Sequence, residues 1–350
     1  MLGMSPRIKK NLILMMLAVL GATSLAAYSR SQYTLKHPNR NHAETELTKN
    51  MKATCLGRFL IDIPSTAEYS IGTIEMGSMK IEYIGKSPSE QVFLDKIKKR
   101  EAELRASKHD SEGTRLRETV AINSNKQRIW VYRGNEFTTG LSWVETFVKA
   151  DGNEWKISFN AADEDVPEVK SLVTRLASEL LPRNMLDVPN IPGACISNGL
   201  IKGSNYEAEN YTAGIRLKNP DITISIKSET SGPRERGQTM LDRVDRANKL
   251  AGEVYNIAFK PIRRAELTVD SRKGQEYVSV LPDKDIENFN AKAEVYGDAT
   301  PKSPTFKIEM DMQRPLKPKA DDKIKTLTNE DALALWDAVI KSIRPRPGAF

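Results

Sequence analysis

The side chains that most often carry catalysis or bind metals are sparse in this chain. Its three histidines are His37, His42 and His109, and none has a cysteine, an aspartate or a second histidine at metal-ligand spacing within a patterned segment. A Ser-His-acid hydrolase needs such a histidine, and the Gly-x-Ser-x-Gly turn that often carries the serine does not occur in the sequence. The sequence therefore predicts no metal site and no catalytic triad.

Two Ser-Lys pairs have a spacing that chemistry could use. Ser225 with Lys227, and Ser271 with Lys273, stand two residues apart on predicted strands, so each pair would share a face of a sheet. Polar residues at a sheet surface explain this spacing more often than a catalytic dyad does. No phosphate-binding glycine run is present, and nothing singles out a pair of carboxylates for glycoside hydrolysis. We expect a protein with no catalytic residues, no cofactor and no enzyme activity.

The two cysteines are the remaining reactive groups, and each begins a similar segment. Cys55-Leu-Gly-Arg-Phe-Leu-Ile61 resembles Cys195-Ile-Ser-Asn-Gly-Leu-Ile201. If the chain is exported, a lone pair of thiols is usually oxidised, and this disulfide would join the first strands of the two halves. The alternative is that each cysteine is a small buried apolar residue at equivalent positions of two cores. Both interpretations stay open, and the bridge is the preferred one.

These cysteine segments are the first of three matches between the halves. The run Gln91–Ile97 is matched by Gln238–Val244, and each half closes on a Pro-Arg pair, at 182–183 and at 345–346. Short matches arise by chance in helix-rich chains, but three in the same order favour duplication. The period is far longer than that of a solenoid repeat. We therefore predict two copies of one domain.

Both halves show the same order of predicted elements. In the first half, strands are expected at 69–74, 79–84, 128–132, 141–150 and 155–159, one helix after an N-cap at Ser87, and another capped by Asp165. In the second half, strands are expected at 215–217, 222–226, 267–269, 275–280 and 305–312, with helices over 238–251 and after Thr328. The predicted fold class is α+β, with two similar domains that each pack helices on a mainly antiparallel sheet.

The N-terminus has the layout of a secretory signal peptide. Basic residues at 7–10 precede the apolar run 12–22, and small residues follow at 24–27. The run is shorter than a comfortable spanning helix, so a cleaved signal is favoured over an uncleaved inner-membrane tether. We therefore divide the chain into a signal peptide or anchor (1–27), a flexible spacer (28–53), an N-terminal domain (54–183), a linker (184–193) and a C-terminal domain (194–346).

Composition and charge describe an ordinary globular protein. Of the 350 residues 39% are apolar and 28% are charged, and the net charge of +7 includes three basic residues of the N-terminal segment. The remaining surplus is mild for two domains and makes no case for nucleic-acid binding. Two basic clusters, 260–264 and 314–319, are most simply solvated loops. Their functional interpretation is a positive rim that meets an acidic partner.

One sequence motif resembles a known family. The start Cys-Leu-Gly-Arg-Phe-Leu-Ile-Asp-Ile-Pro at 55–64, the looser second start at 195–201 and the basic exported N-terminus resemble the immunity proteins paired with type VI secretion lipase effectors of Gram-negative bacteria. The resemblance covers residues 51–346, and the second start departs from it with Leu200 where an aromatic residue would be at home. It implies two α+β lobes that form a claw, grip a cognate phospholipase in the periplasm and have no activity of their own.

Two hypotheses therefore stand. The first is a periplasmic immunity protein that inhibits a cognate lipase effector. The second is a non-catalytic envelope protein, structural or ligand-binding, whose interdomain groove holds a small molecule or a cell-wall fragment. An exported lipase encoded beside this chain would favour the first hypothesis. The sequence identifies no partner-binding residue.

Overall fold

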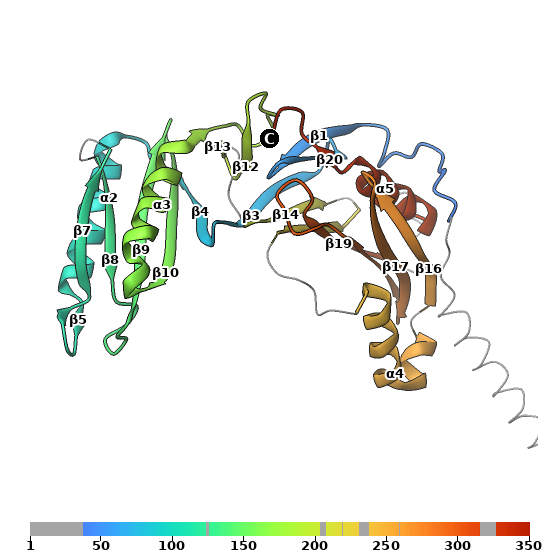
Figure 1. Ribbon diagram of the computed structural model, residues 1–350. Helices are drawn as coiled ribbons and strands as arrows, with labels where there is room; N and C mark the ends of the chain where they lie inside the picture. Colours follow the sequence, from blue (N-terminus) through green and yellow to red (C-terminus); the bar gives the residue numbers. More distant parts are fainter. Residues whose placement is uncertain are drawn as a thin grey trace, which may run out of the picture.

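A computed structural model of the chain describes residues 38–123, 126–203, 208–218, 220–230, 238–258, 260–315 and 327–350. Its main feature is one continuous 12-stranded antiparallel sheet that runs through both halves (Figure 1). The first half contributes β3 (Glu68–Met76), β4 (Met79–Lys86), β7 (Leu116–Ile122), β8 (Gln127–Tyr132), β9 (Leu141–Ala150) and β10 (Asn153–Ala162). The second half contributes β14 (Glu209–Leu217), β15 (Ile222–Glu229), β16 (Lys260–Val269), β17 (Arg272–Asp283), β18 (Ile286–Val295) and β19 (Thr305–Pro315).

The strand order shows the duplication directly. The first half runs β7-β8-β9-β10-β4-β3 from its outer edge, and the second half runs β16-β17-β18-β19-β15-β14. The two six-stranded units meet where β3 pairs with β14, in a register that places Ile71 opposite Ala213. The predicted α+β fold of two similar, mainly antiparallel units is confirmed. The merging of their sheets edge to edge was not predicted.

Within the described ranges, four α-helices cover parts of the two faces of this sheet. They are α2 (Glu90–Ala106), α3 (Val166–Glu179), α4 (Met240–Ala258) and α5 (Asn329–Ser342). Helices α3 and α5 pack on one face, over an apolar core that continues across the β3–β14 junction. Helix α2 packs on the opposite face against Trp130 and Tyr132, and α4 lies on that same face over β17 to β19. Each half therefore has a helix on either side of its sheet.

Helix starts agree only partly with the predicted caps. Thr328 forms the expected capping box with Asp331. The N-cap of α2 is Ser89, whose side chain accepts from the Val92 N–H, so the helix starts later than a cap at Ser87 would place it. Asp165 precedes α3 but makes no side-chain cap hydrogen bond. The Ser87 prediction was wrong because Ser89 offers the same hydroxyl just before the first helical turn.

Short strands link the two halves by exchange. The hairpin of β1 (Met51–Leu56) and β2 (Phe59–Pro64) pairs with β20 (Arg344–Pro345), which follows the last helix of the other half. The hairpin of β12 (Gly193–Ile196) and β13 (Gly199–Lys202) pairs with β11 (Leu180–Pro182), which follows the last helix of the first half. A separate pair, β5 (Lys108–His109) and β6 (Gly113–Thr114), and the short helix η1 (Asp163–Asp165) complete the first half. Each half therefore closes on the hairpin of the other.

The described part of the predicted spacer is held against the second half. Arg40 bonds to Glu276 and Asp337, and the ring of His42 lies 2.8 Å from Asp337. Leu47 is buried, and β1 begins at Met51. The expectation of a flexible segment is wrong here. Glu276 and Asp337 are buried acids of the second half, and the side chains of this segment pair with them.

The predicted signal peptide or anchor at 1–27 lies outside the described residues. Within the described ranges, no helix has the length and apolar content needed to cross a membrane.

Candidate interaction surface

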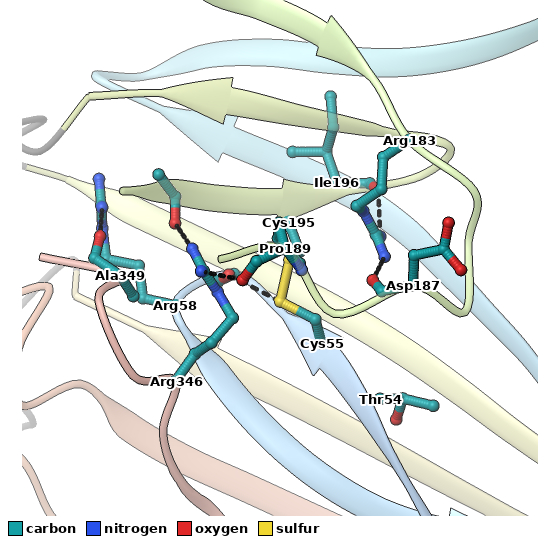
Figure 2. Close-up of a disulfide and its surroundings, with 12 residues drawn as sticks. Thr54, Cys55, Arg58, Arg183, Asp187, Pro189, Cys195, Ile196, Arg346 and Ala349 are labelled. Carbon is teal, nitrogen blue, oxygen red and sulfur yellow. Dashed lines mark hydrogen bonds between the residues drawn. A yellow bond between two sulfur atoms is a disulfide. The ribbon is translucent and has the colours of Figure 1, made fainter. Parts of the chain in front are cut away.

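The two halves are joined by a buried cluster around Cys55 and Cys195, which we call the hub. Cys55 of β1 and Cys195 of β12 are fully buried, joined by a disulfide, and have Cα atoms 5.8 Å apart (Figure 2). Beside them the Gly57 N–H donates to the Cys195 carbonyl at 3.0 Å, and the Cys195 N–H donates to the Gly57 carbonyl at 2.7 Å. The two similar sequence motifs therefore lie directly against each other.

The glycine of the first motif is required at this position. Gly57 has φ +56°, and a Cβ atom placed on it would lie 2.5 Å from the ring of Tyr211. A side chain would therefore suffer both backbone strain and a clash with a buried ring. The geometry of the hub thus depends on the Cys-x-Gly spacing that the sequence shows at 55–57.

The two Pro-Arg pairs complete the hub. The backbone N–H of Arg346 donates to the Arg58 carbonyl at 2.8 Å, and that of Arg183 donates to the Asn198 carbonyl at 3.0 Å. Arg58 and Asn198 occupy equivalent places in their hairpins, because Cys55 pairs with Leu60 just as Cys195 pairs with Leu200. The same contact is thus made twice, each time between one half and the hairpin of the other.

The side chains of these arginines hold the chain between the halves. The guanidinium of Arg183 donates to the carbonyls of Met185, Asp187, Ile196 and Gly199, and that of Arg346 donates to the carbonyls of Pro189, Ile191 and Gly193. Burial lowers the pKa of both groups. A guanidinium offers five N–H donors, so one side chain can satisfy several carbonyls of an irregular segment. The predicted linker at 184–193 is therefore fixed.

A buried ion pair ties the first hairpin to the central sheet. Arg58 donates from Nη2 to Glu209 Oε1 at 2.7 Å and from Nε to Oε2 at 2.9 Å, and both side chains are 1% exposed. The Tyr211 hydroxyl also donates to Glu209 at 2.7 Å. Such a bidentate pair fixes an orientation, and losing one partner would leave a buried charge.

Among the residues that the structure describes, no helix covers one face of the sheet between α2 and α4. Strand β15 shows the alternation of the two faces there: it buries Ile224 and Ile226 and exposes Ser225 and Lys227. The uncovered face carries polar and charged side chains from β10, β4, β3, β14, β15 and β19. We call this surface the open face. In Figure 1 its central strands β3, β4 and β14 form the bridge from which both lobes extend in the same general direction.

Two similar charge triads lie on the open face. In the first, Glu82 accepts from Lys80 at 2.7 Å and from Lys156 at 2.9 Å. These hydrogen bonds outweigh the effect of burial and lower the pKa of Glu82.

The second triad repeats this arrangement on the other half. Glu229 is paired with Lys227 and with Lys307, the latter at 2.7 Å. Burial raises the pKa of Glu229, but the two lysines outweigh it and hold the pKa below its ordinary value. Lys80 and Lys227 stand on β4 and β15, which are equivalent strands of the duplicated fold. The open face therefore offers two equivalent, mildly positive spots.

The structure places the two predicted Ser-Lys pairs differently. Ser225 and Lys227 do share a face, but the Lys227 amine is held by Glu229. Ser271 has φ +61° in the turn between β16 and β17, so it does not lie on a strand with Lys273 as expected.

The histidines that the structure describes also have ordinary partners. His109 is buried with Nε2 3.0 Å from the Thr138 carbonyl, while Nδ1 accepts from the Glu112 N–H at 3.2 Å. His42 contacts Asp337, and His37 lies outside the described residues. Among the residues placed by the structure, no group of three or more His, Cys, Asp or Glu side chains could hold a metal ion.

The first basic cluster is not a solvated loop. Residues 260–264 begin strand β16, where the Arg263 guanidinium bonds Asp337 at 2.7 Å and Glu276 at 3.1 Å. Arg264 pairs with Asp245 of α4 at 2.9 Å. The prediction was wrong because the compensating acids come from distant segments. Of the second cluster, Arg314 pairs with Glu287, and 316–319 lie outside the described residues.

Comparison with protein families decides the identity of this fold. Residues 52–181 match the model of the Tle cognate immunity protein 4 N-terminal domain, and residues 187–348 match that of the C-terminal domain. The chain belongs to the Tle cognate immunity protein 4 family. Both cysteine motifs and both Pro-Arg pairs lie in or directly beside these matched ranges, so the hub is built from the family's two domains.

Solved structures share the fold of this Tle cognate immunity protein 4 chain. The apo immunity protein TplEi of the type VI secretion system from Pseudomonas aeruginosa matches with a TM-score of 0.71 and 22% identity, covering 85% of this chain and 97% of that one. The crystal structure of a Tle4-Tli4 complex contains a chain that matches with a TM-score of 0.73 and 22% identity, covering 85% and 98%. TplEi has also been solved with an "L" peptide, with a TM-score of 0.66 and 21% identity, covering 85% and 99%. None of the curated proteins matches this member of the family.

Proposed function

We propose that this chain is an exported immunity protein that binds and inhibits a cognate type VI secretion lipase effector and so protects the producing cell. The observation that carries the proposal is the open face between α2 and α4, in a chain of the Tle cognate immunity protein 4 family. Two lobes, formed by residues 54–183 and 194–346, would contact one large partner from both ends of this face.

Rigidity of the hub supports a clamp of this kind. The disulfide, the two exchanged strands and the Arg58–Glu209 pair hold the lobes before any partner arrives. A surface ordered in advance loses less conformational entropy when it binds, so more of the contact energy appears as affinity. We expect an interface of at least about 1,600 Å² and nanomolar affinity or better, because a lethal enzyme must be fully occupied.

Inhibition requires no chemistry from the immunity protein. A lipase must bring its active site to a lipid surface, and a large protein seated over the site would exclude the lipid. Among the described residues, His42, His109 and Lys227 have structural partners. We therefore propose a protein without hydrolase activity on lipids, peptides or glycans.

The proposed place of action is the periplasm, reached through a signal peptide at 1–27 that is removed on export. Amino-terminal sequencing of protein taken from the periplasm would test this, and a new N-terminus close to residue 28 is expected. Intact Met1 on protein found only in membranes would support the inner-membrane tether in its place.

The proposed partner can be tested in cells. The lipase effector encoded beside this chain is directed to the periplasm with and without co-expression of the immunity protein. We expect cells to lyse without it, to survive with it, and to yield the lipase when the tagged immunity protein is purified. Continued lysis, or recovery of a bound small molecule with no lipase, would favour the envelope-binding hypothesis.

A further inference from the structure

A groove lies between α4 and the second-half sheet, at one end of the open face. Its volume is about 480 Å³. The helix contributes apolar side chains, among them Val244 and Ala247, and the strands contribute a polar floor that includes Ser279, Asn290 and Lys292. Ala247 is exposed and Val244 is half-buried. We call this feature the α4 groove.

The same helix-to-sheet contact is filled in the first half. Phe93 and Ile97 of α2 are buried against the aromatic side chains of β8 and β9, where the Trp130 and Phe147 ring centroids are 5.3 Å apart. In the matching sequence run on α4, Phe93 and Ile97 are replaced by Met240 and Val244. The corresponding strands β17 and β18 offer one aromatic ring, that of Tyr277, together with Ser279 and Asn290. Both walls therefore carry fewer large apolar side chains than in the first half.

One further helix position also differs between α2 and α4. Arg100 of α2 stacks on the ring of Tyr132 at 5.1 Å and bonds Glu145 at 2.8 Å, so its side chain fills the space beneath the helix. The matching position of α4 is Ala247. The duplicated fold thus contains one filled and one unfilled copy of the same helix-to-sheet contact.

The charges around the α4 groove already have partners within the chain. Arg243 pairs with Glu294, Lys292 pairs with Glu309 at 3.1 Å, and Lys307 belongs to the second triad of the open face. A charged occupant would have to break one of these pairs, whereas an apolar one would gain by covering Val244 and Ala247. The local chemistry therefore favours an uncharged, apolar occupant.

We infer that the α4 groove receives an aromatic or aliphatic side chain carried on a surface segment of the lipase effector. This inference rests on the proposed function. The groove is continuous with the open face through Lys307, which lines both. Pockets that take a buried aromatic anchor are typical positions of high binding energy in protein interfaces. Because the matching contact of the first half is filled, the lipase would dock in one orientation on this duplicated clamp.

A matched pair of variants tests the inference on the full-length mature protein. Ala247→Trp places a large ring in the groove, and Lys249→Trp places the same ring on an exposed position of the same helix that does not line it. The dissociation constant for the purified lipase effector is measured for both and for the unchanged protein. We expect Ala247→Trp to weaken binding by at least about 30-fold, and Lys249→Trp to change it by less than about 3-fold.

Hydrogen exchange of the unchanged protein gives a second readout that needs no variant. Adding the lipase should slow amide exchange in 240–249 and in β18. Amide exchange in α2, whose contact with the sheet is already filled, should change less. Equal binding by both variants, or unchanged exchange along α4, would overturn the inference and leave the proposed function intact. If the unchanged protein fails to bind the lipase, the proposed function and the inference fail together. If Ala247→Trp does not fold, the exchange result alone decides.

Discussion

The backbone N–H of Arg346 donates to the carbonyl oxygen of Arg58 at 2.8 Å, so the end of the chain is fastened to the hairpin at its beginning. The equivalent contact joins Arg183 to Asn198 at 3.0 Å. Because each half supplies the closing strand of the other, the two halves are one cooperative unit even though each repeats the same domain. This relationship decides what should happen when the chain is cut.

A chain divided within 184–193 should work only when both pieces are present. Residues 38–188 and 189–350, expressed separately, each lack a closing strand and expose one edge of the β3–β14 junction. We expect each piece alone to be poorly soluble and to protect cells poorly, and the two together to associate and restore protection. Size-exclusion chromatography and a rescue assay measure both effects. Full protection by either piece alone would show that the exchange of strands is not needed.

The disulfide should add stability without being needed for binding. We propose that Cys55 and Cys195 are joined in the exported protein, and mass spectrometry of unreduced material should find the linked peptides. Replacing both by alanine should lower the free energy of unfolding by up to about 4 to 5 kcal/mol, the chain-entropy value for so long a loop. Lipase affinity should change little because the hub hydrogen bonds remain. Two free thiols in freshly unfolded periplasmic protein would contradict the bridge.

Removing Arg58 should be far more damaging than removing a surface cation. Arg58→Met leaves Glu209 charged and buried, which should cost about 3 to 5 kcal/mol of unfolding free energy. Lys49→Met breaks the exposed pair with Glu46 and should cost less than about 1 kcal/mol. Denaturant unfolding compares the two variants. If Arg58→Met and Lys49→Met are equally stable, the Arg58–Glu209 pair does not hold the hub.

The second half should show an acid-sensitive contribution from Asp337. Burial raises the pKa of Asp337, but hydrogen bonds from Arg263 and His42 and the charge of Arg40 hold it below the ordinary 3.8. An acid whose pKa is lowered by folding stabilises the fold at pH values above its ordinary pKa. This contribution is lost as the pH falls through the folded-state pKa. Unfolding free energy should therefore fall more steeply between about pH 5 and about pH 2 in the natural protein than in Asp337→Asn. If unfolding free energy falls with pH equally in both proteins, Asp337 makes no acid-sensitive contribution.

The sequence predicted the repeated parts of this fold and a disulfide between the halves, but it missed the strand pairings between them. The Cys, Gln-to-Ile and Pro-Arg matches predicted the duplication, because equivalent positions keep their side chains. The pairing of β3 with β14 could not be predicted, since it joins strand edges through backbone groups that every residue has. The backbone hydrogen bond from Arg183 to the hairpin of the second cysteine motif could not be predicted either, because it joins two different halves of the chain.

The charged residues were the hardest to interpret. Arg263 and Arg264 read as a solvated basic cluster because their partners Asp337, Glu276 and Asp245 are far away in the sequence. The two triads had a usable signal: Lys-x-Glu at 80–82 recurs at 227–229, at the same spacing that separates the two matched helix runs. A polar surface shared by β4 and β15 could have been predicted from that repeat, because residues two apart on a strand point to the same face.

The central claim is that this chain neutralises a lipase by binding it, and one titration tests it most directly. The purified lipase effector encoded beside the chain is assayed on phospholipid vesicles while the immunity protein is added in increasing amounts. The account predicts that hydrolysis falls linearly and stops when about one immunity protein is present per lipase, as tight binding requires. Full hydrolysis in the presence of a large molar excess would contradict it.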